Sequence, residues 1–467
     1  MKKVLLAASE CTPYAKVGGL GDVIGALASS MKENGIQADI VLPYYEPLSK
    51  YDFEKVLVLG GETFEIPFLG KSETCSLYKL NIPNTNNVLY GVGNDKYLSN
   101  GGIYLSDDAF SKGDDEPKRF LLFCKAVYYL MESGVFQYEV LHCHDWHTSL
   151  LTHLVRRGGL KCRTILSLHN LANVGAVESS ELNLEIDGTS KSHFMIEVGL
   201  DNADAIVPVS RVYCEELLSG LYTEGLDLAI QRNKEKFVGI INGIDTKYFD
   251  PQSDTFLRVN YGLENWDEGK SDAKKYLFAK FKWDESITDK ICLVGMVGRI
   301  AQQKNIELMC DVIGKLKDEN IRFVILGVGD KLLESKLREL SLQYPEKIVF
   351  VNRFDESLAR YIYAGSDVVA VPSLFEPCGL TQMIAMRYGA LPVVRKVGGL
   401  AETVDNQEDG FVFNNSDSVE LCDLLKKVEN MWRRERSEWN RRVRNSLNKD
   451  FTWTKSALEY IKIYRSF

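Results

Sequence analysis

Histidine and aspartate side chains gather in LHCHDWH, residues 141–147, which has three of the six histidines of the chain. His and Asp are the residue types of a metal site. However, His142 and His144 alternate as on one face of a strand, and no distant further ligand stands out. We therefore interpret the stretch as the polar end of a strand, with Asp145 directed toward a ligand, and predict no metal and no cofactor. A metal site is the alternative.

Paired glycines beside a lysine indicate anion chemistry in KVGGLGD, residues 16–22. Adjacent glycines let backbone N–H groups approach an anion at the start of a helix, and Lys16 adds a positive charge. The stretch has no Walker A pattern, and Ile24 stands where a dinucleotide fingerprint needs its third glycine. A tight turn between a strand and a helix is the alternative.

Cations follow an apolar run again in VGRIAQQKN, residues 297–305. Arg299 and Lys304, ahead of a helical pattern, suit a diphosphate. A pair of solvated surface charges is the alternative. The stretch SLHN, residues 167–170, places His169 at another strand end, where a structural or a functional histidine fits.

The most specific stretch is VPSLFEPCGLTQM, residues 371–383, where a strand is followed by an acid and a helix start. The N–H groups of Gly379, Leu380 and Thr381 could bind an anion. Glu376 beside an anion is unfavourable unless the carboxylate accepts hydrogen bonds from a polyol such as a sugar. A helix-capping acid is the alternative.

Apolar runs that alternate with helical patterns must position these residues. Many runs are continuously apolar, which is typical of parallel strands covered by helices on both faces. The order predicts α/β domains of Rossmann type. Turn residues in 239–254 separate two such series. The predicted strands are 3–9, 38–43, 87–92, 139–144, 163–169, 204–210, 291–299, 322–329, 347–352, 367–373 and 391–396.

Length and charge narrow the function. A chain of 467 residues exceeds one compact core, so two domains are expected. The net charge of −9 argues against nucleic-acid binding. The ten cysteines are scattered, which is typical of reduced thiols in the cytoplasm. No apolar run reaches the roughly 18 residues of a membrane span.

In this order, KVGGLGD, HDWH, HNLA, NGID, GRIAQQK and FEPCGLTQ resemble the bacterial glycogen synthases and plant starch synthases of glycosyltransferase family 5. The resemblance spans nearly the whole chain. It implies the GT-B fold, two Rossmann-like doubly wound α/β domains facing a deep interdomain cleft. Residues 1–242 would form the acceptor-side domain and 243–450 the donor domain, while a helix over 451–467 would cross back to the first domain.

The resemblance also implies an activity, the retaining transfer of glucose from ADP-glucose, or UDP-glucose, to the non-reducing end of an α-1,4-glucan. Lys16, Asp145, His169, Arg299, Lys304 and Glu376 would act in catalysis, with His169 on the glucose 6-hydroxyl. Phe354 would contact the base, and Asn242 would lie near the sugar. The other substrate-binding residues would be Gly18, Gly19, Asp22, Cys378, Gly379, Leu380 and Thr381. A cytoplasmic, or in a plant lineage plastid, location follows.

The chain departs from the family at three places. Asn173 and Val174 replace the usual residues after HNLA, the region from about 176 to 193 is short, and Glu197 stands where a lysine is common. All three changes fall where the resemblance places the acceptor, so they concern the type and chain length of the acceptor more than the reaction of the donor. Ile384 replaces the second acid of many other GT-B enzymes, which resembles family 5 rather than its sister families and leaves the ribose contact unassigned. A transferase with a small acceptor and a non-catalytic glucan-binding homologue are the alternatives.

The pentapeptide KVGGL occurs twice, at residues 16–20 and 396–400. The first copy is followed by Gly21 and Asp22, and the second by Ala401 and Glu402. We assign contact with the sugar donor to the first copy. We expect Lys16→Ala to lower turnover of ADP-glucose far more than Lys396→Ala. Steady-state rates of ADP release with glycogen compare the two variants. The reverse order would assign donor contact to the second copy.

Overall fold

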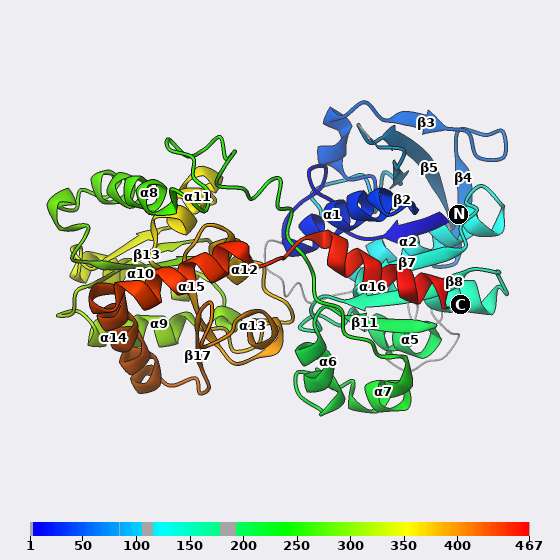
Figure 1. The fold of residues 1–467 in the computed structure, drawn as a ribbon. Coiled ribbons are helices and arrows are strands. Elements are labelled where there is room, and N and C mark those ends of the chain that lie inside the picture. Colours follow the sequence, from blue (N-terminus) through cyan, green and yellow to red (C-terminus); the bar gives the residue numbers. More distant parts are fainter. Residues whose placement is uncertain (1–2, 84, 105–114, 178–192, 467) are drawn as a thin grey trace. The chain divides into compact units, whose positions relative to one another are not determined.

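The computed structural model describes residues 3–83, 85–104, 115–177 and 193–466 (Figure 1). Its internal contacts divide the chain into two compact units. Unit 1 comprises Met1–Gly243 and Trp453–Phe467, and unit 2 comprises Ile244–Thr452. Within the described ranges, no helix is long and apolar enough to cross a membrane.

Unit 1 is built on a nine-stranded sheet in the order β11-β8-β7-β1-β2-β6-β5-β3, with β4 paired to β5. The strands from β11 to β6 are parallel. They confirm the strands predicted from continuous apolar runs in this half of the chain. The bounds are β1 (Lys3–Ala7), β2 (Gln37–Pro43), β6 (Val88–Gly93), β7 (Val140–His144), β8 (Arg163–Leu168) and β11 (Ala205–Pro208).

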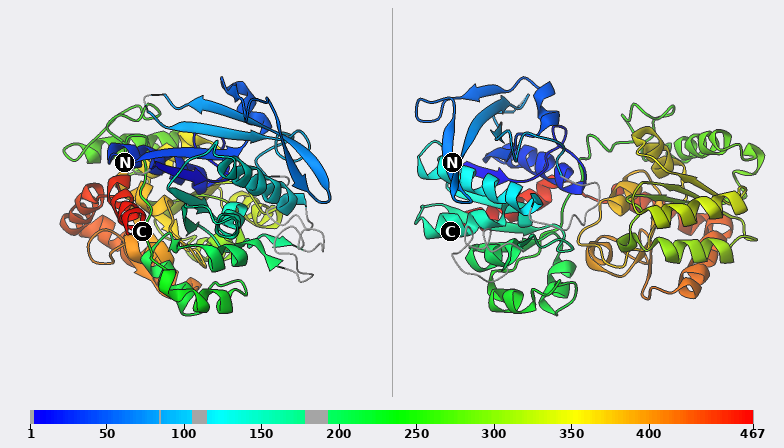
Figure 2. Two further views of the ribbon diagram at one scale, coloured as in Figure 1. Left: turned by 90° about the vertical axis from the view of Figure 1, so that its right-hand side faces the viewer. Right: turned by 180° about the vertical axis from the view of Figure 1, so that it is seen from behind.

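Helices cover both faces of this sheet. α1 (Gly19–Glu33) and α16 (Trp453–Arg465) pack together on one face. α2 (Asp115–Glu132), α3 (Trp146–Arg157) and α5 (Met195–Asn202) lie on the other, seen from behind in Figure 2. The described residues of unit 1 also form α6 (Arg211–Leu218), α7 (Asp227–Arg232), and the 3-10 turns η1 (Glu46–Lys50) and η2 (Lys234–Lys236).

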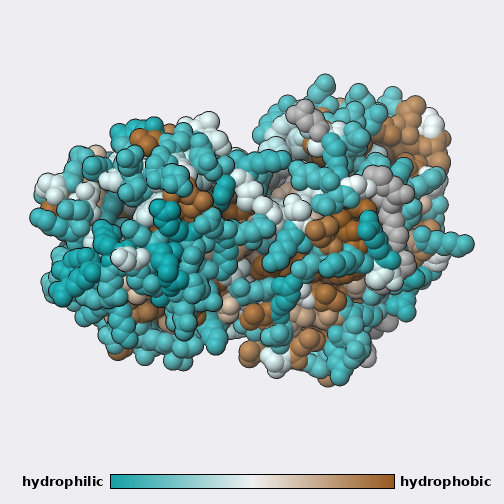
Figure 3. Space-filling model, viewed as in Figure 1, coloured by the Kyte–Doolittle hydropathy of each residue, from teal (hydrophilic) through white to brown (hydrophobic). Residues whose placement is uncertain are grey.

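An antiparallel extension of the sheet, β3 (Glu54–Val56), β4 (Phe64–Phe68) and β5 (Lys71–Asn81), was not predicted. In β4 the buried and exposed residues alternate, as in a strand covered on one face only. Leu57 and Leu59, which follow β3, are exposed, and apolar surface lies near this strand in Figure 3. A short pair, β9 (Ala176–Val177) and β10 (His193–Phe194), was also missed.

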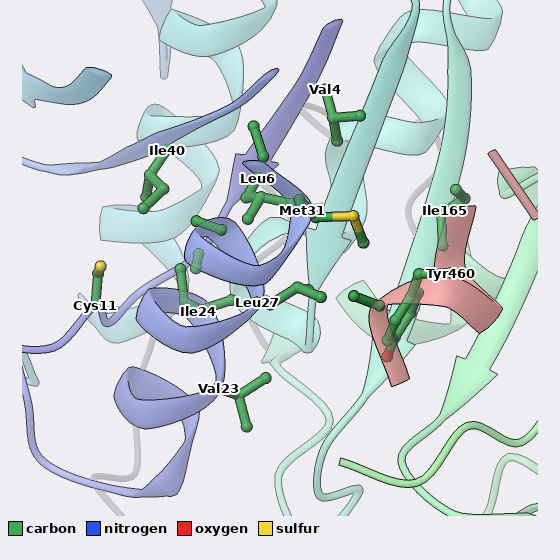
Figure 4. Packing of buried hydrophobic residues seen from close by; sticks show 14 of the residues in the cluster. Val4, Leu6, Cys11, Val23, Ile24, Leu27, Met31, Ile40, Ile165 and Tyr460 are labelled. Atoms are coloured by element: carbon green, nitrogen blue, oxygen red, sulfur yellow. The ribbon is translucent and has the colours of Figure 1, made fainter. Parts of the chain in front are cut away.

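The core of unit 1 joins the two ends of the chain. Ile24, Leu27 and Met31 of α1 are fully buried against β1 and β2 (Figure 4). Tyr460 of α16 is fully buried in the same cluster. Burial of one such side chain contributes about 1.5–3 kcal/mol, so the last helix belongs to the folding unit of the first strand.

Unit 2 has a six-stranded parallel sheet in the order β14-β13-β12-β15-β16-β17. Five of these strands were predicted, and the short β17 was not. The strands are β12 (Cys292–Val297), β13 (Ile321–Leu326), β14 (Ile348–Val351), β15 (Val368–Val371), β16 (Leu391–Arg395) and β17 (Phe411–Phe413). The order reverses between β12 and β15, and at such a point an open α/β sheet presents its ligand site.

The helices of unit 2 begin at clear signals. The side chains of Asp330, Asp355 and Asp417 accept N–H groups at the starts of α10, α11 and α14. The helices are α8 (Trp266–Lys280), α9 (Ile306–Lys315), α10 (Lys331–Gln343), α11 (Glu356–Gly365), α12 (Thr381–Arg387), α13 (Gly398–Thr403), α14 (Ser418–Arg434) and α15 (Arg436–Asn448), with the 3-10 turns η3 (Glu285–Ile287) and η4 (Gln302–Lys304).

Candidate active site

Asp145 connects the carboxyl ends of β7 and β8. Its N–H group donates to the carbonyl of Ser167 at 2.9 Å, and its Oδ1 accepts from the N–H groups of His169 at 2.6 Å and Asn170 at 3.4 Å. The backbone of Asp145 has φ 57° and ψ −173°, which is rare outside glycine. Strained backbone of this kind is typical of functional sites.

Burial and hydrogen bonding act in opposite directions on the pKa of the Asp145 carboxyl group. Burial raises the pKa of Asp145 to about 7, the two backbone N–H groups oppose this rise, and the nearby Glu10 adds to it. The side chain therefore changes charge near neutral pH, which fits a group that contacts substrate.

The first glycine stretch binds a carboxylate of the protein itself. Oε2 of Glu10 accepts from the N–H groups of Val17 and Gly18, both at 2.7 Å, and Oε1 accepts from the Tyr104 hydroxyl at 2.6 Å. A Cβ on Gly21 would lie 3.3 Å from Oε2 of Glu10, which is a tight contact, so a larger residue there would press on this carboxylate. Glu10 was not predicted from the sequence, because the backbone N–H groups that it binds leave no side-chain pattern.

Lys16 is paired with an acid of the helix that follows it. Its Nζ lies 2.7 Å from Oδ1 of Asp22, which also accepts from the Thr12 hydroxyl at 3.0 Å. The Lys16 and Asp22 side chains keep 35% and 26% of their surface exposed. Both can therefore reach a ligand, while Gly19 begins α1 beside them.

Two histidines of β7 and the one that follows β8 lie close together near the strand ends. The rings of His142 and His144 are 4.1 Å apart, which confirms that they share a face. Nδ1 of His144 lies 3.0 Å from Nε2 of His169, and His142 bonds to the hydroxyls of Ser167 and Tyr464. Burial lowers the pKa of both His142 and His169 to about 3, so these rings are neutral near pH 7.

The searched, described part of the chain has no group of three or more His, Cys, Asp or Glu side chains that could hold a metal ion. The ring of His147 lies 4.3 Å from that of Trp146 in a tilted contact and 4.6 Å from that of Phe120 in an edge-to-face contact. It is thus a packed aromatic of the core.

Asn242 is 4% exposed, and its Oδ1 has no hydrogen-bond partner in the described ranges. The preceding carbonyl, of Ile241, accepts from the Ser456 hydroxyl of α16 at 2.6 Å. A buried acceptor without a partner costs roughly 1–3 kcal/mol, which a bound hydroxyl group would relieve.

In unit 2 the strand ends bring together residues 72 positions apart. Nζ of Lys304 lies 2.5 Å from Oε2 of Glu376, which also accepts from the Ser373 hydroxyl at 2.8 Å. Lys304 and Glu376 are 19% and 8% exposed. Arg299 is exposed and donates to Oε1 of Gln303 at 3.3 Å. The helix-capping alternative for Glu376 is wrong, since no side chain caps α12.

The second KVGGL copy packs against the segment that contains Glu376 and donates a hydrogen bond to its backbone. The N–H group of Gly399 donates to the carbonyl of Glu376 at 3.0 Å, and a Cβ on Gly399 would lie only 2.1 Å from the carbonyl oxygen of Cys378. Gln382 donates to the carbonyls of Cys378 and Gly379. These bonds fix the turn that leads to Leu380 and Thr381, both partly exposed.

Phe354 is 82% exposed between β14 and α11. Its neighbours Arg353 and Asp355 form an ion pair at 2.7 Å. The exposed ring is free of intramolecular ring contacts among the described residues, and an aromatic face in this state suits a planar base.

The unusual residues of unit 1 have structural partners. Arg232 of α7 lies 2.9 Å from Glu197 and 2.6 Å from Asp201 of α5, so Glu197 stabilises a helix contact. Oδ1 of Asn173 accepts from the N–H group of Gly175 at 3.1 Å.

Of the region predicted to be short, residues 178–192 lie outside the described residues. In unit 2, Ile384 is buried in the core.

A cavity of about 320 Å³ lies elsewhere in unit 2, lined by residues of 244–263 and 447–452 and by Arg387. Arg387 pairs with Asp250 at 3.0 Å, and Lys449 pairs with Asp409. None of the predicted site residues lines this cavity. Its charges are satisfied within the protein, so we do not assign the active site to it.

Comparison with known proteins identifies the family. Residues 3–232 match the starch synthase catalytic domain, and residues 278–446 match the glycosyl transferases group 1. The glycogen synthase of Thermodesulfovibrio yellowstonii is 32% identical over 489 residues, covering 99% of this chain and 97% of that one. That of Gloeobacter violaceus is 35% identical over 473 residues, covering 99% and 98%. The chain belongs to the glycogen and starch synthase family.

Enzymes of the glycogen and starch synthase family transfer glucose from ADP-glucose to an α-1,4-glucan (EC 2.4.1.21). The catalytic domain of starch synthase IV from Arabidopsis thaliana, solved with ADP and acarbose, is 27% identical with a TM-score of 0.88 over 100% of this chain and 99% of that one. Sucrose-phosphate synthase from Thermosynechococcus elongatus, 18% identical with a TM-score of 0.64 over 100% and 99% of the two chains, shares the fold alone. The GT-B fold of the predicted family is thus confirmed.

We expect Asp145→Asn to abolish transfer yet raise the melting temperature at about pH 8, with a gain that shrinks toward about pH 5. Folding raises the carboxyl pKa from 3.8 to about 7, so the wild type loses stability as pH rises through this range. Asn keeps the oxygen that accepts the two N–H groups but has no charge to bury. We therefore expect the free energy of unfolding to rise by roughly 1–4 kcal/mol at pH 8.

Thermal unfolding at the two pH values measures this gain, and Asp22→Asn is the matched control, because its carboxylate is partly exposed and lies outside the Asp145 bonds. A stability difference between Asp145→Asn and the wild type that is the same at both pH values would contradict the prediction.

Proposed function

We propose that unit 2 binds ADP-glucose through its diphosphate and through hydroxyls of its glucosyl group, and that unit 1 binds other hydroxyls of the glucosyl group and the glucan. The observation that carries this assignment is the cluster of Lys304, Glu376 and Ser373, with Arg299 after the same strand as Lys304. It combines cations for a diphosphate with a carboxylate for sugar hydroxyls. Starch synthase IV was solved with ADP and acarbose bound, which supports binding of ADP and of a sugar by this chain.

The cations of unit 2 would act on the leaving group. Transfer breaks the bond between the anomeric carbon and the phosphate oxygen, so negative charge grows on the diphosphate. Arg299 and Lys304 would stabilise that charge, helped by the N–H groups of Leu380 and Thr381 at the start of α12. Preorganised charges of this kind lower the barrier because they need no rearrangement during the reaction.

The proton balance needs no carboxylate pair of the glycosidase type. A hydroxyl oxygen of the glucan forms the new bond to the anomeric carbon on the face that ADP leaves. The configuration is retained because the new bond forms on the same face, and the proton of the hydroxyl group moves to the departing phosphate oxygen. Glu376 would then serve as an acceptor for glucose hydroxyls, held in place by Lys304 and Ser373.

Unit 1 would offer acceptors for the hydroxyl groups of glucose. Glu10, Asp145 and the unpartnered Oδ1 of Asn242 are buried acceptors. Since Glu10 already binds the N–H groups of Val17 and Gly18, contact of this stretch with glucose is favoured over contact with a phosphate. Lys16, with Gly19 and Asp22 beside it, supplies the one cation of this set.

The proposed partners are ADP-glucose and an α-1,4-glucan, with no nucleic acid. All ten cysteines are free thiols. This supports a reducing compartment, the cytoplasm.

Loss of the unit 2 pair should stop transfer without unfolding the protein. We expect Lys304→Ala and Glu376→Ala each to lower kcat by on the order of 10²–10³-fold, because each removes a charge placed at the donor. ADP release with glycogen as acceptor measures the effect, and exposed Lys396→Ala is the matched control. Unchanged rates in both variants would refute the assignment.

The exposed Phe354 should determine donor affinity. If its ring stacks on adenine, worth about 1–3 kcal/mol, Phe354→Ala raises KM for ADP-glucose roughly 5- to 100-fold with little change in kcat, and Phe354→Tyr keeps KM low. Competition between ADP-glucose and UDP-glucose tests the nucleotide, and we expect ADP-glucose to be preferred. Equal KM values for the Ala variant and the wild type would exclude stacking on Phe354.

A further inference from the structure

A pair of histidines from neighbouring strands shares one hydrogen bond beneath the proposed glucose site. Nδ1 of His144, the last residue of β7, lies 3.0 Å from Nε2 of His169, which follows β8. His144 is fully buried, whereas His169 is partly exposed. Thus one ring can meet a ligand and the other cannot.

Neither ring is held by a charged partner. In the described ranges, no carboxylate lies within bonding distance of either ring, and the carboxylate of Asp145 bonds to the backbone N–H group of His169 instead. Burial lowers the pKa of His144 well below its usual value and that of His169 to about 3. Two neutral rings therefore share a single hydrogen.

The second nitrogen of His144 decides which ring donates. Its Nε2 is buried and has no partner within the described part of the chain. If His169 donated its Nε2–H, the hydrogen of His144 would be on that Nε2, as a buried donor without an acceptor. A buried lone pair without a donor is less rare than a buried N–H without an acceptor. Hence His144 donates through Nδ1–H, and Nε2 of His169 accepts.

We propose that His144 is a positioning residue that fixes His169 as its Nδ1–H tautomer, so that His169 presents a hydrogen-bond donor to an oxygen of the glucosyl group. The role at glucose rests on the proposed function, whereas the tautomer rests on the geometry alone. Which nitrogen of a histidine has the proton is set by the bond that the other nitrogen makes.

The surroundings of His144 hold its ring still. The Thr148 hydroxyl bonds to the backbone N–H group of His144 at 2.7 Å and to its carbonyl at 3.1 Å. The ring packs on that of His142, which is fixed at both nitrogens by the hydroxyls of Tyr464 and Ser167. A donor kept in one place and one tautomer needs no reorganisation when substrate binds.

The tautomer can be read from ¹⁵N chemical shifts of histidine-labelled full-length protein without ligand, with His169→Asn to assign the signal. We expect a protonated Nδ1 and an unprotonated Nε2 for His169. His144→Phe should release His169 into a mixture of tautomers and lower kcat/KM for ADP-glucose about 10-fold. His144→Asn, whose amide can donate from the position of Nδ1, should restore part of both.

His147→Phe is the matched control, since it replaces a buried histidine nearby that does not bond to His169. It should change neither the tautomer nor kcat/KM, and the melting temperature of each variant reports folding. An Nε2–H tautomer for His169 in the wild type would overturn the proposal, as would equal kcat/KM for the Asn and Phe variants of His144. The predicted tautomer without ADP-glucose turnover in the wild type would uphold the pairing and refute the proposed function.

Discussion

The two hydrogen bonds that Asp145 accepts from the N–H groups of His169 and Asn170 hold the site of unit 1 together. They join the ends of β7 and β8, so the residue of each strand end that reaches a ligand is fixed relative to the other. The side chain of Asp145 is buried, and its backbone has a positive φ angle that is rare for residues other than glycine. Both features lower the stability of the fold at the residue that fixes the two strand ends, and such a trade of stability for function is common in enzymes.

Much of the fold was predictable because parallel strands buried on both faces are continuously apolar. The extension β3–β5 was missed since its strands alternate and are short or polar. The site was predictable as residue types at strand ends. The partners were not: Glu10 binds backbone N–H groups, which leave no side-chain pattern, and the Lys304–Glu376 contact depends on the pairing of β12 with β15.

The repeated pentapeptide shows how one sequence pattern serves two structural purposes. In the first copy the N–H group of Gly18 binds the buried side-chain carboxylate of Glu10 in unit 1. In the second copy the N–H group of Gly399 binds the main chain beneath Glu376, and the absence of a side chain admits the Cys378 carbonyl. The same glycine pair thus supplies an N–H donor in both units, to a side-chain carboxylate in the first and to a main-chain carbonyl in the second.

The chain leaves unit 1 at Gly243 and returns to it at Trp453, and the returning helix has consequences during synthesis. Trp453, Tyr460 and Tyr464 fill the core beside α1, and Tyr464 bonds to His142. On the ribosome, unit 2 can therefore complete its core while unit 1 still waits for the last residues to emerge. A chain that terminates early by one helix would leave apolar surface of the first-made half open to chaperones and proteases.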